Sequence, residues 1–245
     1  MTRPWRIVVG AAALTAVAAL AGCESTQDKS DRLRKQAKRF VNKQKGVVVT
    51  RTNRQVKVTD TTVLHDENGT AVVAELSNSS PKIMAGVPVS IDVKSGANKS
   101  LFRNDTPGLE PALTSVAVLP PREDLFWVND QVPLSGTPKD VDVKVGVARG
   151  QAPAKPPKLE VSRPKFQGDP TSGIAAVGYV KNESKLLQTK VTVFCVARKG
   201  GRVIAAGRSG IQRIKPGRRG RYKVFFIGNP RGGRLEAWAP PTVLR

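Results

Sequence analysis

An internal repeat is the feature that most constrains the fold of this chain. When the sequence is laid on itself at a shift of 104 residues, the segment beginning at Gly69 matches the segment beginning at Gly173 without a gap. The matched pairs are Gly69/Gly173, Ala71/Ala175, Val73/Val177, Asn78/Asn182, Ser80/Ser184, Val87/Val191, Val89/Val193 and Gly96/Gly200. A register shared over this length indicates two copies of one structural unit.

The alternation of apolar and polar residues within each copy predicts β-strands. Apolar residues recur at every second position, which is the spacing of side chains on one face of a strand. The series are Val87, Val89, Ile91 and Val93; Val141, Val143, Val145 and Val147; Val191, Val193, Cys195 and Ala197; and Tyr222, Val224 and Phe226. Short strands punctuated by Gly, Pro, Asn and Asp favour an all-β chain with two tandem immunoglobulin-like β-sandwich domains, each of about 100 residues.

The segment between the two copies predicts the domain boundaries. Residues 151–157 contain three prolines, which remove backbone donors and favour an extended, semi-rigid chain. We therefore place the first β-sandwich at residues 46–150, a Pro-rich linker at residues 151–157 and the second β-sandwich at residues 158–245.

The first 22 residues have the parts of a bacterial export signal in the expected order. Arg3 and Arg6 supply the positive start, and the uncharged run 7–20 is shorter than the roughly 20 apolar residues that a membrane span needs. The stretch Leu20-Ala21-Gly22-Cys23 then resembles the lipobox of bacterial lipoproteins. The resemblance implies that residues 1–22 are removed, that Cys23 carries a covalent lipid, and that the protein lies on the outer face of the cytoplasmic membrane. The alternative is an ordinary secretory signal followed by a chance cysteine.

Residues 23–45 are interpreted as the lipidated cysteine and a basic stalk. A short helix is expected over residues 30–45, with Ser30 or Asp31 as the N-cap and one apolar face. That face contains Leu33, Ala37, Phe40 and Val41. Two interpretations stay open: the helix lies on anionic headgroups beside the anchor, or it is a solvated spacer that holds the sandwiches away from the membrane.

The second copy resembles the FxLYD family of immunoglobulin-like extracytoplasmic domains. The resemblance spans residues 173–226 and depends on the strand 176–184 (AVGYVKNES), the strand 191–194 (VTVF), Gly200-Gly201 and Pro216-Gly217. The motif that names the family is altered here to the residues 194–198 (FCVAR), and the first copy keeps only the Asn-x-Ser strand and the paired valines. The resemblance implies a β-sandwich outside the cytoplasm and no particular activity.

Most of the net charge of +22 belongs to the second copy. Residues 46–150 contain 11 Lys and Arg against 12 Asp and Glu, whereas residues 158–245 contain 19 against 4. The candidate residues for binding an anionic partner lie in two turn-rich clusters: Arg198, Lys199 and Arg202, and then Arg213, Lys215, Arg218, Arg219, Arg221 and Lys223. If both turns lie at one end of the sandwich, they form a single basic surface. The alternative is a charge that serves only solubility.

Three kinds of anionic partner fit such a surface. Lipid headgroups, anionic cell-wall polymers and nucleic acid all attract it through counterion release. A lipid-anchored protein outside the cytoplasm meets the first two, so nucleic acid is the less favoured partner. A protein partner that contacts the sandwich faces is a further alternative.

Few residues suit catalysis or metal binding. His65, the only histidine, lies in the polar run 65–69, which is typical of a hairpin turn and lacks convergent metal ligands. Cys195 lies in an apolar alternating series and is expected to be a core residue. The aromatic residues Phe126, Trp127 and Trp238 are also expected in the core. The acid pairs Glu123-Asp124 and Asp105 with Glu110 have no separation fixed by the sequence, as glycan hydrolysis requires.

The sequence therefore predicts a non-enzymatic, membrane-anchored envelope lipoprotein that acts as a binding or scaffolding module. No catalytic residue, no metal site and no cofactor other than the covalent lipid on Cys23 is expected. The alternatives are an envelope enzyme that acts on cell-wall glycan and a lipoprotein subunit of a larger membrane complex.

Overall fold

The computed structural model describes residues 46–169 and 173–244. The signal peptide, the lipid-bearing Cys23 and the basic helix expected over residues 30–45 lie outside these ranges. The described chain belongs to one compact unit, Gln44–Arg245. None of its described helical segments has the length and apolar character that crossing a membrane requires.

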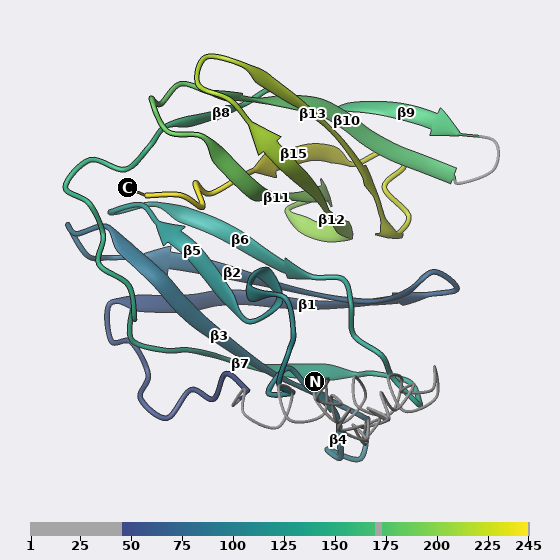
Figure 1. The fold of residues 1–245 in the computed structure, drawn as a ribbon. Coiled ribbons are helices and arrows are strands. Elements are labelled where there is room, and N and C mark those ends of the chain that lie inside the picture. Colours follow the sequence, from purple (N-terminus) through teal and green to yellow (C-terminus); the bar gives the residue numbers. More distant parts are fainter. Residues whose placement is uncertain (1–45, 170–172, 245) are drawn as a thin grey trace, which may run out of the picture. The chain divides into compact units, whose positions relative to one another are not determined.

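The prediction of an all-β chain is confirmed, because the described residues form antiparallel β-sheets and one short 3-10 turn (Figure 1). The elements are β1 (Val56–Asp66), β2 (Gly69–Asn78), β3 (Met84–Lys94), β4 (Ser100–Arg103), η1 (Pro111–Leu113), β5 (Ser115–Leu119), β6 (Asp124–Asn129), β7 (Asp140–Val145), β8 (Leu159–Val161), β9 (Lys165–Asp169), β10 (Gly173–Asn182), β11 (Gln188–Lys199), β12 (Arg202–Ile214), β13 (Arg219–Phe225), β14 (Ile227–Gly228) and β15 (Arg234–Trp238).

The two copies of the repeat share strand pairing as well as sequence. In the first copy, β2 pairs with β1 and β6, while β3 pairs with β4, β5 and β7. In the second copy, β10 pairs with β8, β9 and β13, while β11 pairs with β12 and β15. The matched segments thus occupy matched places, with β2 equivalent to β10 and β3 equivalent to β11.

A buried asparagine explains the Asn-x-Ser part of the repeat. Asn182, which ends β10, is fully buried. Its Nδ2 donates to the carbonyl oxygens of Leu186 at 2.7 Å and Ile214 at 2.9 Å, and its Oδ1 accepts the backbone N–H of Ser184 at 3.0 Å. The amide therefore satisfies backbone groups of a turn and of the neighbouring sheet that would otherwise be buried without partners.

Asn78 makes the equivalent bonds at the end of β2. Its Nδ2 donates to the carbonyl oxygen of Pro120 at 2.6 Å, and its Oδ1 accepts the N–H of Ser80 at 3.0 Å. The sequence comparison pairs the corner at Pro120 with the corner at Ile214. The same side chain bonds both corners, so the structure confirms the repeat.

One apolar core extends across both copies. The cluster that contains Trp127 and Ile91 of the first copy also includes Phe194 and Val196 of β11. The ring of Phe194 is 1% exposed and stacks on Trp238, with centroids 5.5 Å apart. Phe194 therefore packs against the first copy, although its strand pairs only within the second.

A polar link also joins the copies. Arg208 of β12 donates from Nε to Asp130 Oδ1 at 2.6 Å and from its backbone N–H to Asp130 Oδ2 at 3.0 Å. Its Nη1 lies 3.2 Å from Glu110. The Arg208 side chain is 7% exposed, whereas that of Glu110 is 56% exposed. Asp130 is therefore the partner that neutralises this buried cation.

Candidate functional site

The strand β13 carries the candidate site because its two faces differ. Tyr222 and Val224 point into the core and are 4% and 0% exposed, as their alternation predicts. Arg219 and Arg221 lie between them in the series, on the opposite, exposed face. Because side chains on one face of a strand repeat every two residues, these guanidinium groups leave the sheet about 6.8 Å apart.

The neighbouring strand β10 supplies the floor of this face. Tyr179 lies opposite Arg221 and Val177 lies opposite Lys223 in the antiparallel register. Together these strands and β9 border a groove of about 730 Å³, which we call the basic groove. Its lining residues are Gln167, Val177, Gly178, Tyr179, Arg219, Arg221, Tyr222 and Lys223.

Close packing beneath the groove fixes its shape. A Cβ atom on Gly178 would lie 2.4 Å from the hydroxyl oxygen of Tyr222 and 2.7 Å from Ser162 Oγ, so this position requires glycine. The Tyr222 hydroxyl donates to the Ser162 carbonyl oxygen at 3.3 Å. Burial raises the pKa of Tyr222 to about 12, so its phenol stays neutral at physiological pH.

Aromatic rings hold two of the cations against the sheet. The Arg219 guanidinium carbon lies 4.3 Å from the centroid of the Tyr179 ring, and Lys223 Nζ lies 4.8 Å from that of Phe225. Cation–π contacts at exposed sites contribute about 0.5–1 kcal/mol each. The rings therefore orient positive charge without neutralising it.

The acids of this sheet are engaged at its other end. Lys181 pairs with Glu183 at 2.9 Å and with Glu160 at 3.8 Å. Hydrogen bonds from Lys158 and Lys181 lower the pKa of Glu183 to about 2. In the described part of the chain, no acid pairs with Arg219 or Arg221. The basic groove therefore presents uncompensated positive charge.

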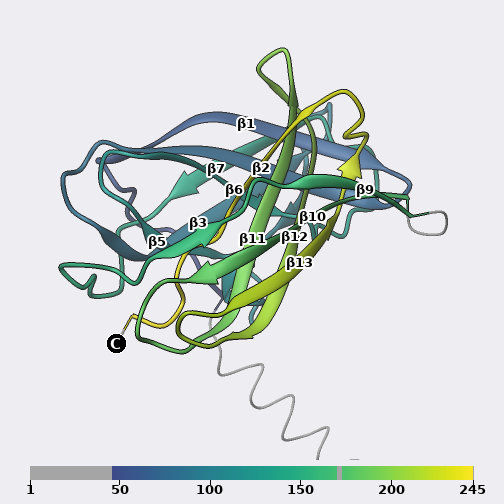
Figure 2. The same ribbon diagram turned by 90° about the horizontal axis from the view of Figure 1, so that it is seen from above.

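The two predicted basic clusters lie far apart, so the expectation of one combined surface is wrong. Lys199 pairs with Arg202 at one end of the β11–β12 hairpin, and Gln188 pairs with Ile214 at the other. The 13 residues of β12 separate the ends, which corresponds to roughly 40 Å. Figure 2 shows this hairpin extended along its length.

The second cluster surrounds the basic groove, whereas the first is divided. Arg213, Lys215 and Arg218 lie at or beside the β12–β13 turn, next to Arg219, Arg221 and Lys223. Lys199 and Arg202 are exposed at the distant turn.

Arg198 of the first cluster has a structural role. Its guanidinium pairs with Glu75 of the first copy and with Glu236 of β15, the latter at 3.1 Å. The Arg198 side chain is 16% exposed. It therefore joins the two copies and is not an open anion-binding group.

The same contact bears on one predicted acid pair. Glu123 and Asp124 border a groove of about 300 Å³ that Glu75 and Glu236 also line. Arg198 lies among these acids and engages the latter two. The groove is thus organised around a cation of the protein itself.

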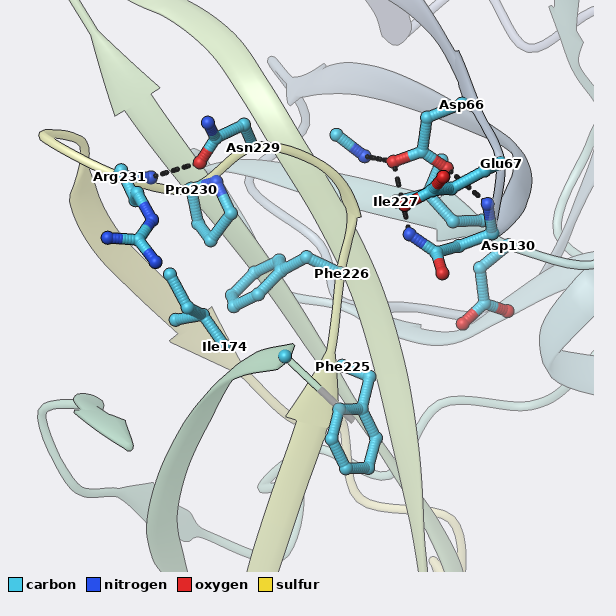
Figure 3. Close-up of a pocket in the computed structure, with 13 residues that line it drawn as sticks. Asp66, Glu67, Asp130, Ile174, Phe225, Phe226, Ile227, Asn229, Pro230 and Arg231 are labelled. Carbon is cyan, nitrogen blue, oxygen red and sulfur yellow. Dashed lines mark hydrogen bonds between the residues drawn. The ribbon is translucent and has the colours of Figure 1, made fainter. Parts of the chain in front are cut away.

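The largest pocket, of about 820 Å³, lies where β13 ends and is shown in Figure 3. The figure shows Phe226 on one wall, with Asp66 and Asp130 opposite. Asp66 Oδ2 accepts the N–H of Gly228 at 2.8 Å, and Asp130 accepts the two bonds from Arg208. Both aspartates therefore support the fold.

The run around His65 is a hairpin turn, as predicted. His65 Nδ1 is 2.7 Å from Thr70 Oγ1, and Asp66 Oδ1 accepts the N–H of Asn68 at 2.8 Å. Across residues 46–169 and 173–244, no three His, Cys, Asp or Glu side chains converge.

Cys195 is confirmed as a core residue, because its side chain is 0% exposed. Burial, with a smaller effect from Glu236, raises the pKa of its thiol to about 12. A thiolate is the reactive form, so the native thiol is inert at pH 8. The predicted core position of Phe126 and Trp127 is also confirmed.

We therefore expect Cys195 to resist alkylation. In the unit Gln44–Arg245, where it is the only cysteine, maleimide labelling at pH 8 should proceed only as fast as the chain unfolds. Mass spectrometry of samples with and without urea measures this. Rapid labelling of the native chain would show that the strand opens locally.

Some groove residues were not singled out by the sequence. Arg219 and Arg221 were identified from charge, but Tyr179 and Val177 were missed because their position depends on the register between β10 and β13. The alternation in β13 is the signal for its outer face, since the residues between Tyr222 and Val224 must point outward. Neither a scan against protein-family models nor a search of curated proteins finds a match to this chain.

Proposed function

We propose that this chain is a non-enzymatic lipoprotein of the bacterial envelope, anchored through Cys23 to the outer face of the cytoplasmic membrane. Its β-rich unit acts as a binding module for an anionic polymer. The anchor brings the module to the membrane, and the basic groove contacts the polymer near it.

The observation that carries the proposal is the pair Arg219 and Arg221, exposed in a groove with no acid partner among the described residues. A guanidinium presents a planar fork of donors that matches the oxygens of phosphate and carboxylate groups. The Tyr179 ring keeps one of these forks in place. The excess of 19 basic over 4 acidic residues in 158–245 adds a long-range attraction of the same sign.

Two measurements test the two parts of this proposal. For the anchor, the full chain and its Cys23→Ala variant are expressed in a bacterium, and membrane and soluble fractions are compared. We expect the full chain in the membrane fraction and release of the variant. For the binding, the full chain in neutral detergent is mixed with poly(glycerol phosphate), polyglutamate or anionic vesicles over a salt series.

The outcomes separate the alternatives. Binding to at least one polyanion that weakens with rising salt supports the binding module. If none of the three polyanions binds at low salt, the module has no anionic partner and the positive charge serves solubility. Retention of the Cys23→Ala chain in membranes would contradict the lipid anchor.

A further inference from the structure

The cations of β13 form a line. Arg219 and Arg221 lie on one face of a single strand, about 6.8 Å apart, and Lys223 follows at the same interval. A flat membrane surface does not require such an arrangement, because headgroups diffuse to any exposed charge. A line of evenly spaced cations within a groove matches one extended chain with a negative charge in every repeat.

The rings beside this line are already used. Arg219 covers a face of Tyr179, and Lys223 covers a face of Phe225. Proteins that bind single-stranded nucleic acid offer aromatic faces on which bases stack. Sugar rings also use such open faces. Because each ring here carries a cation of the protein, the groove favours a polymer that has neither bases nor sugar rings in its backbone.

We propose that the basic groove binds a poly(polyol phosphate) chain lying along β13, with successive phosphates on Arg219 and Arg221. This rests on the proposed function, because it names the polymer that the module would take. Each guanidinium donates two N–H bonds to one phosphodiester. The flexible polyol bridges lie over Tyr179 and Val177, which require no base or sugar for contact.

The test compares two double variants that remove the same charge. Arg219→Gln/Arg221→Gln changes the groove, and Lys199→Gln/Arg202→Gln changes the exposed turn at the far end of β12. All four side chains are exposed, so both variants should stay folded, which circular dichroism checks. The full chain in neutral detergent is titrated with fluorescently labelled poly(glycerol phosphate) over a salt series.

We expect the groove variant to lose about tenfold or more in affinity at low salt, and its slope of log K against log salt to fall by about 1.4. The turn variant should keep the affinity and slope of the parent within about twofold. This difference would locate the polymer on β13.

Three results would overturn the proposal. Equal losses in the two variants would mean that net charge alone attracts the polymer; the broader proposed function would then survive. An oligonucleotide or polyglutamate with the same number of charges that binds as tightly, with the same loss in the groove variant, would remove the polyol phosphate specificity. No binding of any polyanion by the parent would overturn this proposal together with the binding module.

Discussion

Replacement of Asp130 by alanine is expected to lower the free energy of unfolding by about 3–5 kcal/mol, the typical cost of leaving a buried charge without its partner. The Arg208 side chain is 7% exposed, and Asp130 accepts bonds from both its guanidinium and its backbone N–H. Without that carboxylate, the cation stays in a site that solvent reaches poorly. Urea unfolding of the unit Gln44–Arg245 measures the change.

Glu110→Ala provides the matched control. Glu110 pairs with the same guanidinium at 3.2 Å, but its own side chain is 56% exposed. Surface ion pairs contribute about 0–1 kcal/mol, so this variant should unfold nearly as the parent does. Similar losses in the two variants would show that Asp130 is not the dominant partner.

Phe194→Ala is expected to cost about 3–5 kcal/mol, as other large-to-small substitutions of buried aromatic residues do. The Phe194 ring is 1% exposed, stacks on Trp238 and belongs to the core cluster that includes Trp127 of the first copy. Its removal leaves a cavity where the two copies meet. We expect one cooperative urea transition at a lower midpoint, followed by tryptophan fluorescence.

Phe166→Ala is the control for this substitution, because Phe166 is 48% exposed on the edge strand β9. Surface changes of this kind usually stay within about 0.5 kcal/mol. A loss below about 1 kcal/mol for Phe194→Ala would contradict a core shared by the two copies. A second transition, present only in the variant, would show that the copies unfold separately once the ring is gone.

The strands were predictable because their signal is local. Val87 to Val93 and Val191 to Ala197 alternate within single strands, and both series are buried where the sequence places them. The repeat also predicts that Asn78 and Asn182 occupy equivalent places. It does not show that both are buried, because an Asn-x-Ser sequence is also common in exposed turns.

The contacts between the copies were not predictable in the same way. Arg208 and Asp130 are 78 residues apart, and neither has a neighbour in the sequence that indicates the other. Arg198 looks like Arg202 in the sequence, since both lie in one basic turn. Only the structure shows that Arg198 pairs with Glu75 across the two copies, while Arg202 is exposed.

The candidate site was partly predictable for the same reason. Charge counting identifies Arg219, Arg221 and Lys223, and the buried series Tyr222, Val224 and Phe226 places them on one outer face. The groove itself needs the register that puts Tyr179 opposite Arg221. A register is set by pairing between strands distant in sequence, which a pattern within one strand does not contain.

The buried asparagines also affect how this protein is best produced. Asn78 and Asn182 each begin an Asn-x-Ser acceptor sequence for N-linked glycosylation. The sugar would be joined to the same Nδ2 atom that donates to Pro120 or Ile214 inside the sandwich. In a eukaryotic secretory pathway, a glycan added to the unfolded chain at either position would block closure of that sandwich. A host that lacks this modification therefore suits the fold.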